Sequence, residues 1–106
     1  MGDRTSAESE APRVAVVGSG AWGTTLAILV ARSEPVILLS HSAATAERIA
    51  AARENERRLP GVALPDRIQV TADPGTLEVA TVLAILAVPS AHLRSTVERV
   101  ARFVPG

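Results

Sequence analysis

The segment Gly18–Gly23 constrains the fold of this chain more than any other part of it. It reads Gly-Ser-Gly-Ala-Trp-Gly and directly follows the short apolar run Val14–Val17. The next residues, Ala21–Arg32, carry apolar side chains at helical spacing. We expect the inner face of that helix to hold four of them, Leu26, Ala27, Val30 and Ala31. A strand, a glycine-rich turn and a helix in this order predict the first half of a βαβ unit.

Each glycine of the segment has a separate role in such a unit. Gly18 allows the tight turn from strand to helix, Gly20 lets the backbone approach a pyrophosphate, and Gly23 lets the helix pack closely on the strand. The helix N-terminus adds unpaired N–H groups and the positive end of its dipole. The residues expected to bind a dinucleotide here are therefore Gly18, Ser19, Gly20, Ala21, Trp22 and Gly23. A glycine turn without a ligand is the disfavoured alternative, because strand, helix and next strand are all in register.

Strand-like apolar runs and helical periods alternate along the rest of the chain. We expect strands at 14–17, 36–39, 67–71 and 82–88, and helices at 21–32, 43–53, 74–79 and from 90 onward. Ser42 is expected to cap the second helix, and Asp73-Pro74 to begin the third. Apolar strands that alternate with helices predict parallel pairing through right-handed crossovers. The fold class is α/β, an incomplete Rossmann-like parallel sheet with flanking helices, since a complete dinucleotide fold has about six strands.

One domain is expected in this chain. Residues 1–12 are polar and acidic, which predicts a disordered tail. Residues 13–106 are expected to form an NAD(P)-binding Rossmann-type domain, of which only the N-terminal part is present and from which the catalytic domain is absent. The strand at 82–88 and the last helix would then expose an apolar edge, which predicts marginal stability or a homodimer.

Composition disfavours several other classes of function. The formal net charge is zero, so we expect no partner among nucleic acids or anionic membranes. Trp22 and Phe103 are the only aromatic residues, which disfavours a reader of stacked bases. The chain has no cysteine and no cluster with metal-ligand spacing, so no metal site is expected. Neither a secretory signal nor an apolar run of about 18–20 residues occurs, and the expected location is the cytoplasm.

The tip of the second expected strand bears on the choice between NAD and NADP. An acidic residue there usually binds the ribose 2′-hydroxyl of NAD, but the sequence reads Ser40-His41-Ser42. No carboxylate repels a 2′-phosphate at this tip, and two hydroxyl groups and an imidazole offer hydrogen bonds to it. We therefore expect NADP or NAD as cofactor, with NADPH favoured and with Ser40 and His41 in the site. The alternative is a solvated histidine beside a serine that only caps the helix.

Three other residues near the expected loop have open interpretations. Trp22 is either a wall beside the cofactor or a packing anchor under the loop. His92 begins the last helix and is interpreted as a surface or capping residue rather than a general acid, because no carboxylate is spaced to partner it. Arg58 lies in a mixed-charge stretch that is expected to be solvated.

Three segments together resemble one protein family. They are Gly18–Ala27 (GSGAWGTTLA), Asn55–Leu64 (NERRLPGVAL) and Leu86–Ser90 (LAVPS). In sequence and spacing they are similar to the N-terminal part of NAD(P)-dependent glycerol-3-phosphate dehydrogenase of the bacterial type, from about residue 14 to residue 106. The resemblance implies the cofactor-binding part of an oxidoreductase. That enzyme reduces dihydroxyacetone phosphate to sn-glycerol 3-phosphate with NADPH or NADH and serves phospholipid synthesis.

The resemblance also implies roles for particular residues. Cofactor contacts are implied at Ser19, Ala21, Trp22, His41, Pro89 and Ser90, the last two at the nicotinamide end. The family's reactive lysines belong to a T-K-G segment and a C-terminal domain that lie outside this chain, and the chain itself has no lysine. No catalytic residue is therefore expected here. The chain is expected to be inactive alone and to meet dihydroxyacetone phosphate only together with the missing domain.

The chain departs from the family pattern at two positions, and two other functions are alternatives to the one that the resemblance implies. The N-x-x-x-L-P-G loop usually carries an aromatic residue where Arg58 stands, and some members present an aromatic residue to the cofactor where Leu93 stands. A stand-alone dinucleotide-binding or regulatory module without catalysis is the alternative function. Another Rossmann-type reductase is less favoured, because of the loop at 55–61.

Overall fold

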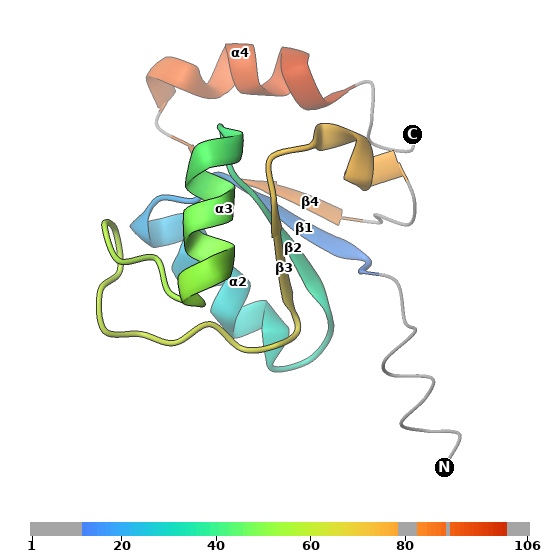
Figure 1. Cartoon of the computed structure of the whole chain (residues 1–106). Helices are drawn as coiled ribbons and strands as arrows, with labels where there is room; N and C mark the ends of the chain where they lie inside the picture. The colour runs from blue at the N-terminus through green and yellow to red at the C-terminus, as the bar shows by residue number, and fades with distance from the viewer. Residues whose placement is uncertain (1–11, 79–82, 89, 102–106) are drawn as a thin grey trace.

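The chain forms a parallel four-stranded sheet with helices on both faces (Figure 1). A computed structural model describes residues 12–78, 83–88 and 90–101. The strands are β1 (Val14–Val17), β2 (Val36–Leu39), β3 (Ile68–Thr71) and β4 (Leu83–Leu86). Their order in the sheet is β3-β2-β1-β4, and all three pairings are parallel. The connection after β3 therefore crosses past two strands to place β4 beside β1, so a crevice opens between the carboxyl ends of β1 and β4.

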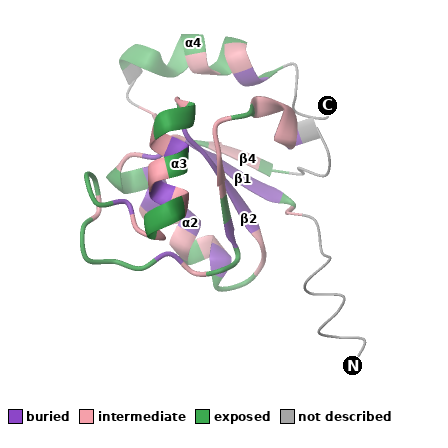
Figure 2. Ribbon diagram, in the orientation of Figure 1, coloured by how far each residue is buried: buried purple, intermediate pink, exposed green. Residues whose placement is uncertain are grey.

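Two layers of helix cover the sheet. The elements are α2 (Ala21–Ala31), α3 (Ala43–Ala52), the 3₁₀ helix η1 (Pro74–Glu78) and α4 (Ser90–Val100). On one face, Val16 and Leu38 of the central strands pack with Ala27 of α2 and Ile49 of α3. The alternate residues of the same strands pack on the other face with Leu77 of η1 and Val100 of α4. The two apolar cores explain why β1 and β2 are buried along their whole length (Figure 2).

The sequence-predicted elements agree with the structure to within two residues for most boundaries, and the fold class is confirmed. The short helix expected from Pro74 is present, and it is of the 3₁₀ type. The Asp73 side chain caps its start by accepting from Gly75 N at 2.9 Å, and Asp73 O accepts from Thr76 N at 3.1 Å, which closes a tight i+3 turn. The residues expected as a disordered tail lie almost wholly outside the described part.

The buried face of α2 is larger than expected. Ala27 and Ala31 are buried as predicted, but the rest of the buried face is made by Gly23 and Thr24 near the N-terminus of the helix. Leu26 and Val30 are partly buried and pack against the same core, as expected. The helix therefore turns its small residues to the sheet, which lets its first turn lie close to the strand ends.

The long connection between α3 and β3 is held by Arg53. This residue caps the C-terminus of α3 in the left-handed conformation, with φ of 53° and ψ of 38°. Its guanidinium donates to Pro65 O at 2.6 Å and to Ile68 O at 3.1 Å, and its own carbonyl accepts from Leu64 N at 2.8 Å. One arginine thus joins the start and the end of the connection.

The α4 side of the sheet is more open than the α2 side. Leu83 and Leu86 of β4 are 53% and 39% exposed, and most of α4 is exposed as well (Figure 2). The apolar edge expected at this strand is therefore present, whereas the predicted homodimer stays a prediction. Among the described residues, no helix has the length and apolar character needed to cross a membrane.

Candidate functional site

The turn after β1 is built by Gly18, and no other residue fits there. Its φ is +119°, a conformation that residues with a side chain rarely adopt. A Cβ at this position would also lie 2.3 Å from Ala87 O, in the segment that follows β4. The N–H of Gly18 donates to Leu39 O at 2.9 Å and so extends the ladder between β1 and β2 by one residue. The chain leaves the sheet at this point.

Gly23 brings the first turn of α2 against the same turn. A Cβ at Gly23 would come within 1.8 Å of Gly18 O and within 3.4 Å of the Ala87 side chain. Both neighbours belong to the turn or to the strand end, so neither can move as a flexible side chain would. The first and third glycines of the motif are therefore required by packing inside the protein.

The middle glycine has a different environment. A Cβ built on Gly20 would have no protein atom within 4 Å, so the described structure itself does not require glycine there. Gly20 precedes α2 in an extended conformation, with φ of −73° and ψ of −172°, and its carbonyl accepts the first helical bond, from Thr24 N. The N–H groups of Ala21, Trp22 and Gly23 lie in the first turn, outside the helical ladder. Open space, exposed backbone and the positive end of the helix dipole coincide at Gly20.

A buried network of polar side chains fixes the loop from below. Asn55 is 3% exposed and lies 36 residues further along the chain than Ser19. Its amide donates to Ser19 O at 2.7 Å and to Thr24 Oγ1 at 2.8 Å, which uses both of its N–H bonds. The Ser19 and Ser40 hydroxyl groups lie 3.0 Å apart and share a hydrogen bond. The loop, the start of α2 and the tip of β2 are therefore held in one geometry.

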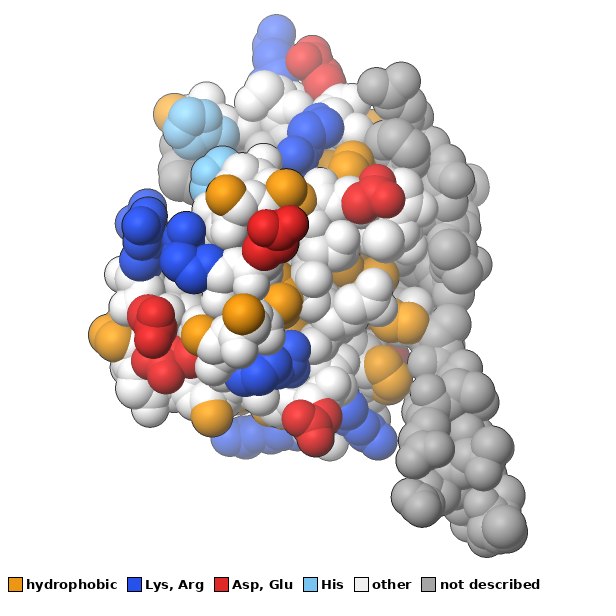
Figure 3. Space-filling view, viewed as in Figure 1, with side chains coloured by type: hydrophobic (Ala, Val, Ile, Leu, Met, Phe, Trp, Pro, Cys, Tyr) orange, Lys and Arg blue, Asp and Glu red, His pale blue; other side chains and the backbone are white. Residues whose placement is uncertain are grey.

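A cavity of about 530 Å³ lies above this loop, at the carboxyl ends of the strands. Its floor is apolar and consists of Val17, Leu39, Ala87 and Val88, with Gly18, Ser19 and Gly20 at one side. Four basic side chains form the walls, namely His41, Arg58, His92 and Arg99, and none of its described lining residues is acidic. Both histidines, in pale blue, lie side by side at the upper left of Figure 3, with arginine side chains below them. Such a cavity suits an anionic ligand.

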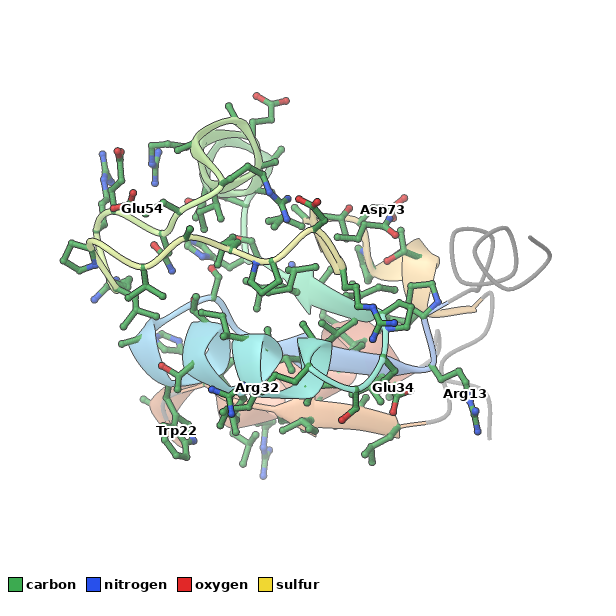
Figure 4. All side chains as sticks on the ribbon, turned by 90° about the horizontal axis from the view of Figure 1, so that it is seen from below. Arg13, Trp22, Arg32, Glu34, Glu54 and Asp73 are labelled. Atoms are coloured by element: carbon green, nitrogen blue, oxygen red, sulfur yellow. The ribbon has the colours of Figure 1, made fainter. Side chains whose placement is uncertain are left out.

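The structure brings some of the expected site residues to this cavity and leaves others away from it. Ser40 is fully buried beneath the loop, where it supports Ser19 rather than facing the cavity. Ala21 is exposed in the first turn of α2. Trp22 is 67% exposed and points outward from α2 (Figure 4), so it is no packing anchor under the loop. Pro89 lies outside the described residues, as does the side chain of Ser90.

Four residues of this region were not predicted as parts of the site. Asn55 and Arg58 are supplied by the connection after α3, and His92 and Arg99 by α4. The N-x-x-x-L-P-G spacing was the one available indication for Asn55. Residues 92, 95, 96 and 99 of α4 line the cavity at a helical period, which the sequence shows only once the cavity is known. Arg58 and His92 are exposed, as expected, and both also line the cavity.

The fold and this loop define an α/β domain of the dinucleotide-binding class. Residues 13–106 match the family described as NAD-dependent glycerol-3-phosphate dehydrogenase N-terminus. The glycerol-3-phosphate dehydrogenase (NAD(P)+) of Thermus thermophilus is 51% identical over 86 residues, which are 80% of this chain and 27% of the relative. That of Halorhodospira halophila is 42% identical over 97 residues, which are 91% of this chain and 29% of the relative. The chain belongs to this family of NAD(P)-dependent dehydrogenases, to its N-terminal domain.

Solved structures agree with this assignment. The glycerol-3-phosphate dehydrogenase of Coxiella burnetii superposes with a TM-score of 0.81 at 27% identity, over 88% of this chain and 29% of that one. The Plasmodium falciparum enzyme has a TM-score of 0.79 at 19% identity, over 97% and 32%, which shows a common fold. The chain spans a little over a quarter of the length of the curated relatives named above.

Proposed function

We propose that this chain binds NADPH or NADH, with the pyrophosphate on the N-terminus of α2 between Gly18 and Gly23. The observation that carries the proposal is the contrast among the three glycines. Gly18 and Gly23 are enclosed by protein atoms, whereas Gly20 faces open space beside a cavity with basic walls. A glycine that the protein's own packing does not need is accounted for by a ligand whose phosphates approach the backbone.

The residues present fit such a cofactor. The first-turn N–H groups of Ala21, Trp22 and Gly23 supply donors for phosphate oxygens, and the dipole of α2 adds a favourable field. The apolar cavity floor accepts the flat faces of the ribose and base. His41 faces the cavity from the tip of β2, where the 2′-position of the adenosine ribose is expected, with no carboxylate in the lining. We infer a preference for NADPH over NADH from this arrangement.

We further propose that the whole enzyme uses this cofactor to reduce dihydroxyacetone phosphate to sn-glycerol 3-phosphate. The support is membership of the family, together with the cofactor site described above. The nicotinamide chemistry consists of hydride transfer to a carbonyl carbon, which needs a proton donor at the carbonyl oxygen. No lysine is present in this chain, and we propose that it supplies the cofactor site but not the reacting groups. A cytoplasmic location remains a prediction from the sequence.

The single tryptophan provides a direct test of the proposed binding. Trp22 belongs to the loop itself, and energy transfer from its indole to a reduced nicotinamide ring requires proximity rather than contact. The folded chain should lose tryptophan emission saturably when NADPH is added, and more weakly when NADH is added. Free N-acetyltryptophanamide corrects for absorbed light. Titration calorimetry of the same samples gives the affinity without the fluorophore. Absence of heat and quenching in a folded sample would reject cofactor binding by this chain.

A further inference from the structure

We propose that Arg58 determines the preference for NADPH by binding the 2′-phosphate of the adenosine together with His41. The inference rests on the proposed function, since it assumes a dinucleotide on the glycine loop. It assigns to the proposed 2′-phosphate site a residue that lies outside the tip of β2. Of the tip residues only His41 lines the cavity, and the tip carries no permanent positive charge, which Arg58 supplies from another part of the chain.

The position of Arg58 is fixed by the same residue that fixes the glycine loop. Asn55 holds Ser19 O through its side chain, and its own carbonyl accepts from Arg58 N at 3.3 Å and from Leu59 N at 2.7 Å. Arg58 therefore begins one tight turn away from a buried anchor. A few residues on, Gly61 N donates to the Glu54 carboxylate at 2.8 Å and closes the turn from the other side. The backbone beneath the Arg58 side chain is thus held in a defined place next to the loop.

The direction of the bound cofactor assigns the 2′-phosphate to Arg58 rather than to the other arginine of the cavity. In this fold the pyrophosphate lies over the end of β1, and the adenosine ribose lies towards the end of β2. His41 comes from that strand, and Arg58 comes from the connection that leads from β2 and α3 into β3. Arg99 comes from the last turn of α4, where Val100 packs with Leu77 of η1 on the face of the sheet opposite α2 and α3. Arg99 therefore reaches the cavity from that face, whereas Arg58 lies on the α2 face together with the proposed pyrophosphate site.

The chemistry of the side chain supports the same assignment. A guanidinium group binds phosphate oxygens with two parallel N–H donors and keeps its charge at any physiological pH. The described lining of the cavity holds no carboxylate to compete for it. The side chain is exposed, so the bond to a phosphate forms at the rim, where both water and ligand have access. A dianionic phosphate between Arg58 and His41 gains a charge-assisted hydrogen bond that the 2′-hydroxyl of NADH does not make.

The neighbouring arginine provides a matched control for the test. Arg57 is also exposed and lies one residue earlier, but it does not line the cavity. The affinities of the unaltered chain, Arg58→Gln, Arg58→Lys and Arg57→Gln would be measured by calorimetry for NADPH, NADH and adenosine 2′,5′-bisphosphate. Because Arg58 is exposed, its replacement should leave the thermal unfolding unchanged, and circular dichroism checks this for each variant.

The inference predicts a selective loss. Arg58→Gln should lower the affinity for NADPH and for adenosine 2′,5′-bisphosphate by about tenfold or more, as expected for a lost hydrogen bond between charged groups. The affinity for NADH should stay unchanged. Arg58→Lys should recover part of the loss, and Arg57→Gln should bind like the unaltered chain. An equal loss for NADPH and NADH would place Arg58 on a part that both cofactors share and would overturn the inference.

The remaining outcomes separate the inference from the proposed function. Unchanged NADPH binding in Arg58→Gln, or equal affinity of the unaltered chain for NADPH and NADH, overturns the inference while dinucleotide binding stands. Binding of neither cofactor by the folded, unaltered chain overturns both. A loss in Arg57→Gln as large as that in Arg58→Gln would show a general effect of charge and would also count against a contact at Arg58.

Discussion

Replacing Gly23 and Gly20 separately with alanine should separate two roles of the glycine motif, packing inside the protein and binding of the proposed cofactor. At Gly23 the new Cβ meets Gly18 O at 1.8 Å, and the two atoms have to separate to beyond 3.0 Å before the contact becomes tolerable. The atom in the way belongs to a backbone carbonyl, whose own turn is closed by a hydrogen bond to Leu39 O. The first turn of α2 or the end of β1 therefore has to shift.

The magnitude of that destabilisation follows from two opposed terms. Overpacking a well-packed site costs about 1–3 kcal/mol, and a clash with backbone belongs at the upper end. Alanine in place of glycine in a helix returns up to about 1 kcal/mol. We expect Gly23→Ala to lower the free energy of unfolding by about 2 kcal/mol, which corresponds to a fall in melting temperature of about 10 °C for a domain of this size.

Gly20→Ala should give the opposite pattern. The backbone at Gly20 is extended and accessible to alanine, and the added Cβ meets no protein atom within 4 Å. The free energy of unfolding should stay within about 1 kcal/mol of that of the unaltered chain. NADPH affinity should fall, because the Cβ enters the space proposed for the pyrophosphate.

The assay is unfolding in urea followed by far-UV circular dichroism, with NADPH binding measured by calorimetry on the same samples. Unfolding of Gly23→Ala at the same urea concentration as the unaltered chain would show that the turn accepts a Cβ without shifting. NADPH binding by Gly20→Ala as tight as that of the unaltered chain would show that the pyrophosphate does not lie at Gly20.

Three further substitutions test the contacts that support the site. Asn55→Asp removes both N–H donors beneath the loop and should lower the free energy of unfolding by about 3 kcal/mol or more, measured in urea, because a carboxylate is then buried against Ser19 O. Ser42→Ala removes the side-chain cap that accepts from Thr45 N at 3.2 Å and should cost about 1 kcal/mol in the same assay; an unchanged midpoint would show that the cap is dispensable. Arg53→Lys keeps the charge but not the paired donors to two carbonyls, and we expect a loss of about 1–2 kcal/mol and faster proteolysis after α3, whereas a melt like that of the unaltered chain would contradict this role.

Local patterns were sufficient to predict the elements of this fold. The run Val14–Val17 is a buried central strand because all four side chains are apolar, and Ser42 caps α3 because its hydroxyl group accepts from the first turn. The glycine loop was predictable for the same reason, because Gly18 and Gly23 are required by the turn itself and by the adjacent strand end. The helix at Pro74–Glu78 was predicted, but its 3₁₀ type was not, because a cap and a proline begin either type of helix.

Contacts between distant segments could not be predicted in this way. Asn55 reaches Ser19 across 36 residues, and no periodicity shows which polar residue of a long connection turns inward. Arg58 comes from the connection between α3 and β3, and His92 comes from α4, which follows β4. They line the same cavity only because the crossover after β3 places β4 beside β1. Both were predicted to lie at the surface and both are exposed, but a sequence does not distinguish an exposed basic residue at the rim of a cavity from one elsewhere.

The amide of Asn55 couples the conformation of the glycine loop to the opening and closing of the connection after α3. If the connection opens, Ser19 O loses its donor and the loop loses the geometry that the proposed cofactor requires. Linkage then works in both directions with the same free energy. A substitution in the connection should change the affinity for the nucleotide even where the substituted residue does not contact it. Bound nucleotide should in turn lower the population of the open connection. Hydrogen exchange at Leu59 and Leu64, whose N–H groups close the connection, would report the occupancy of a site they do not contact.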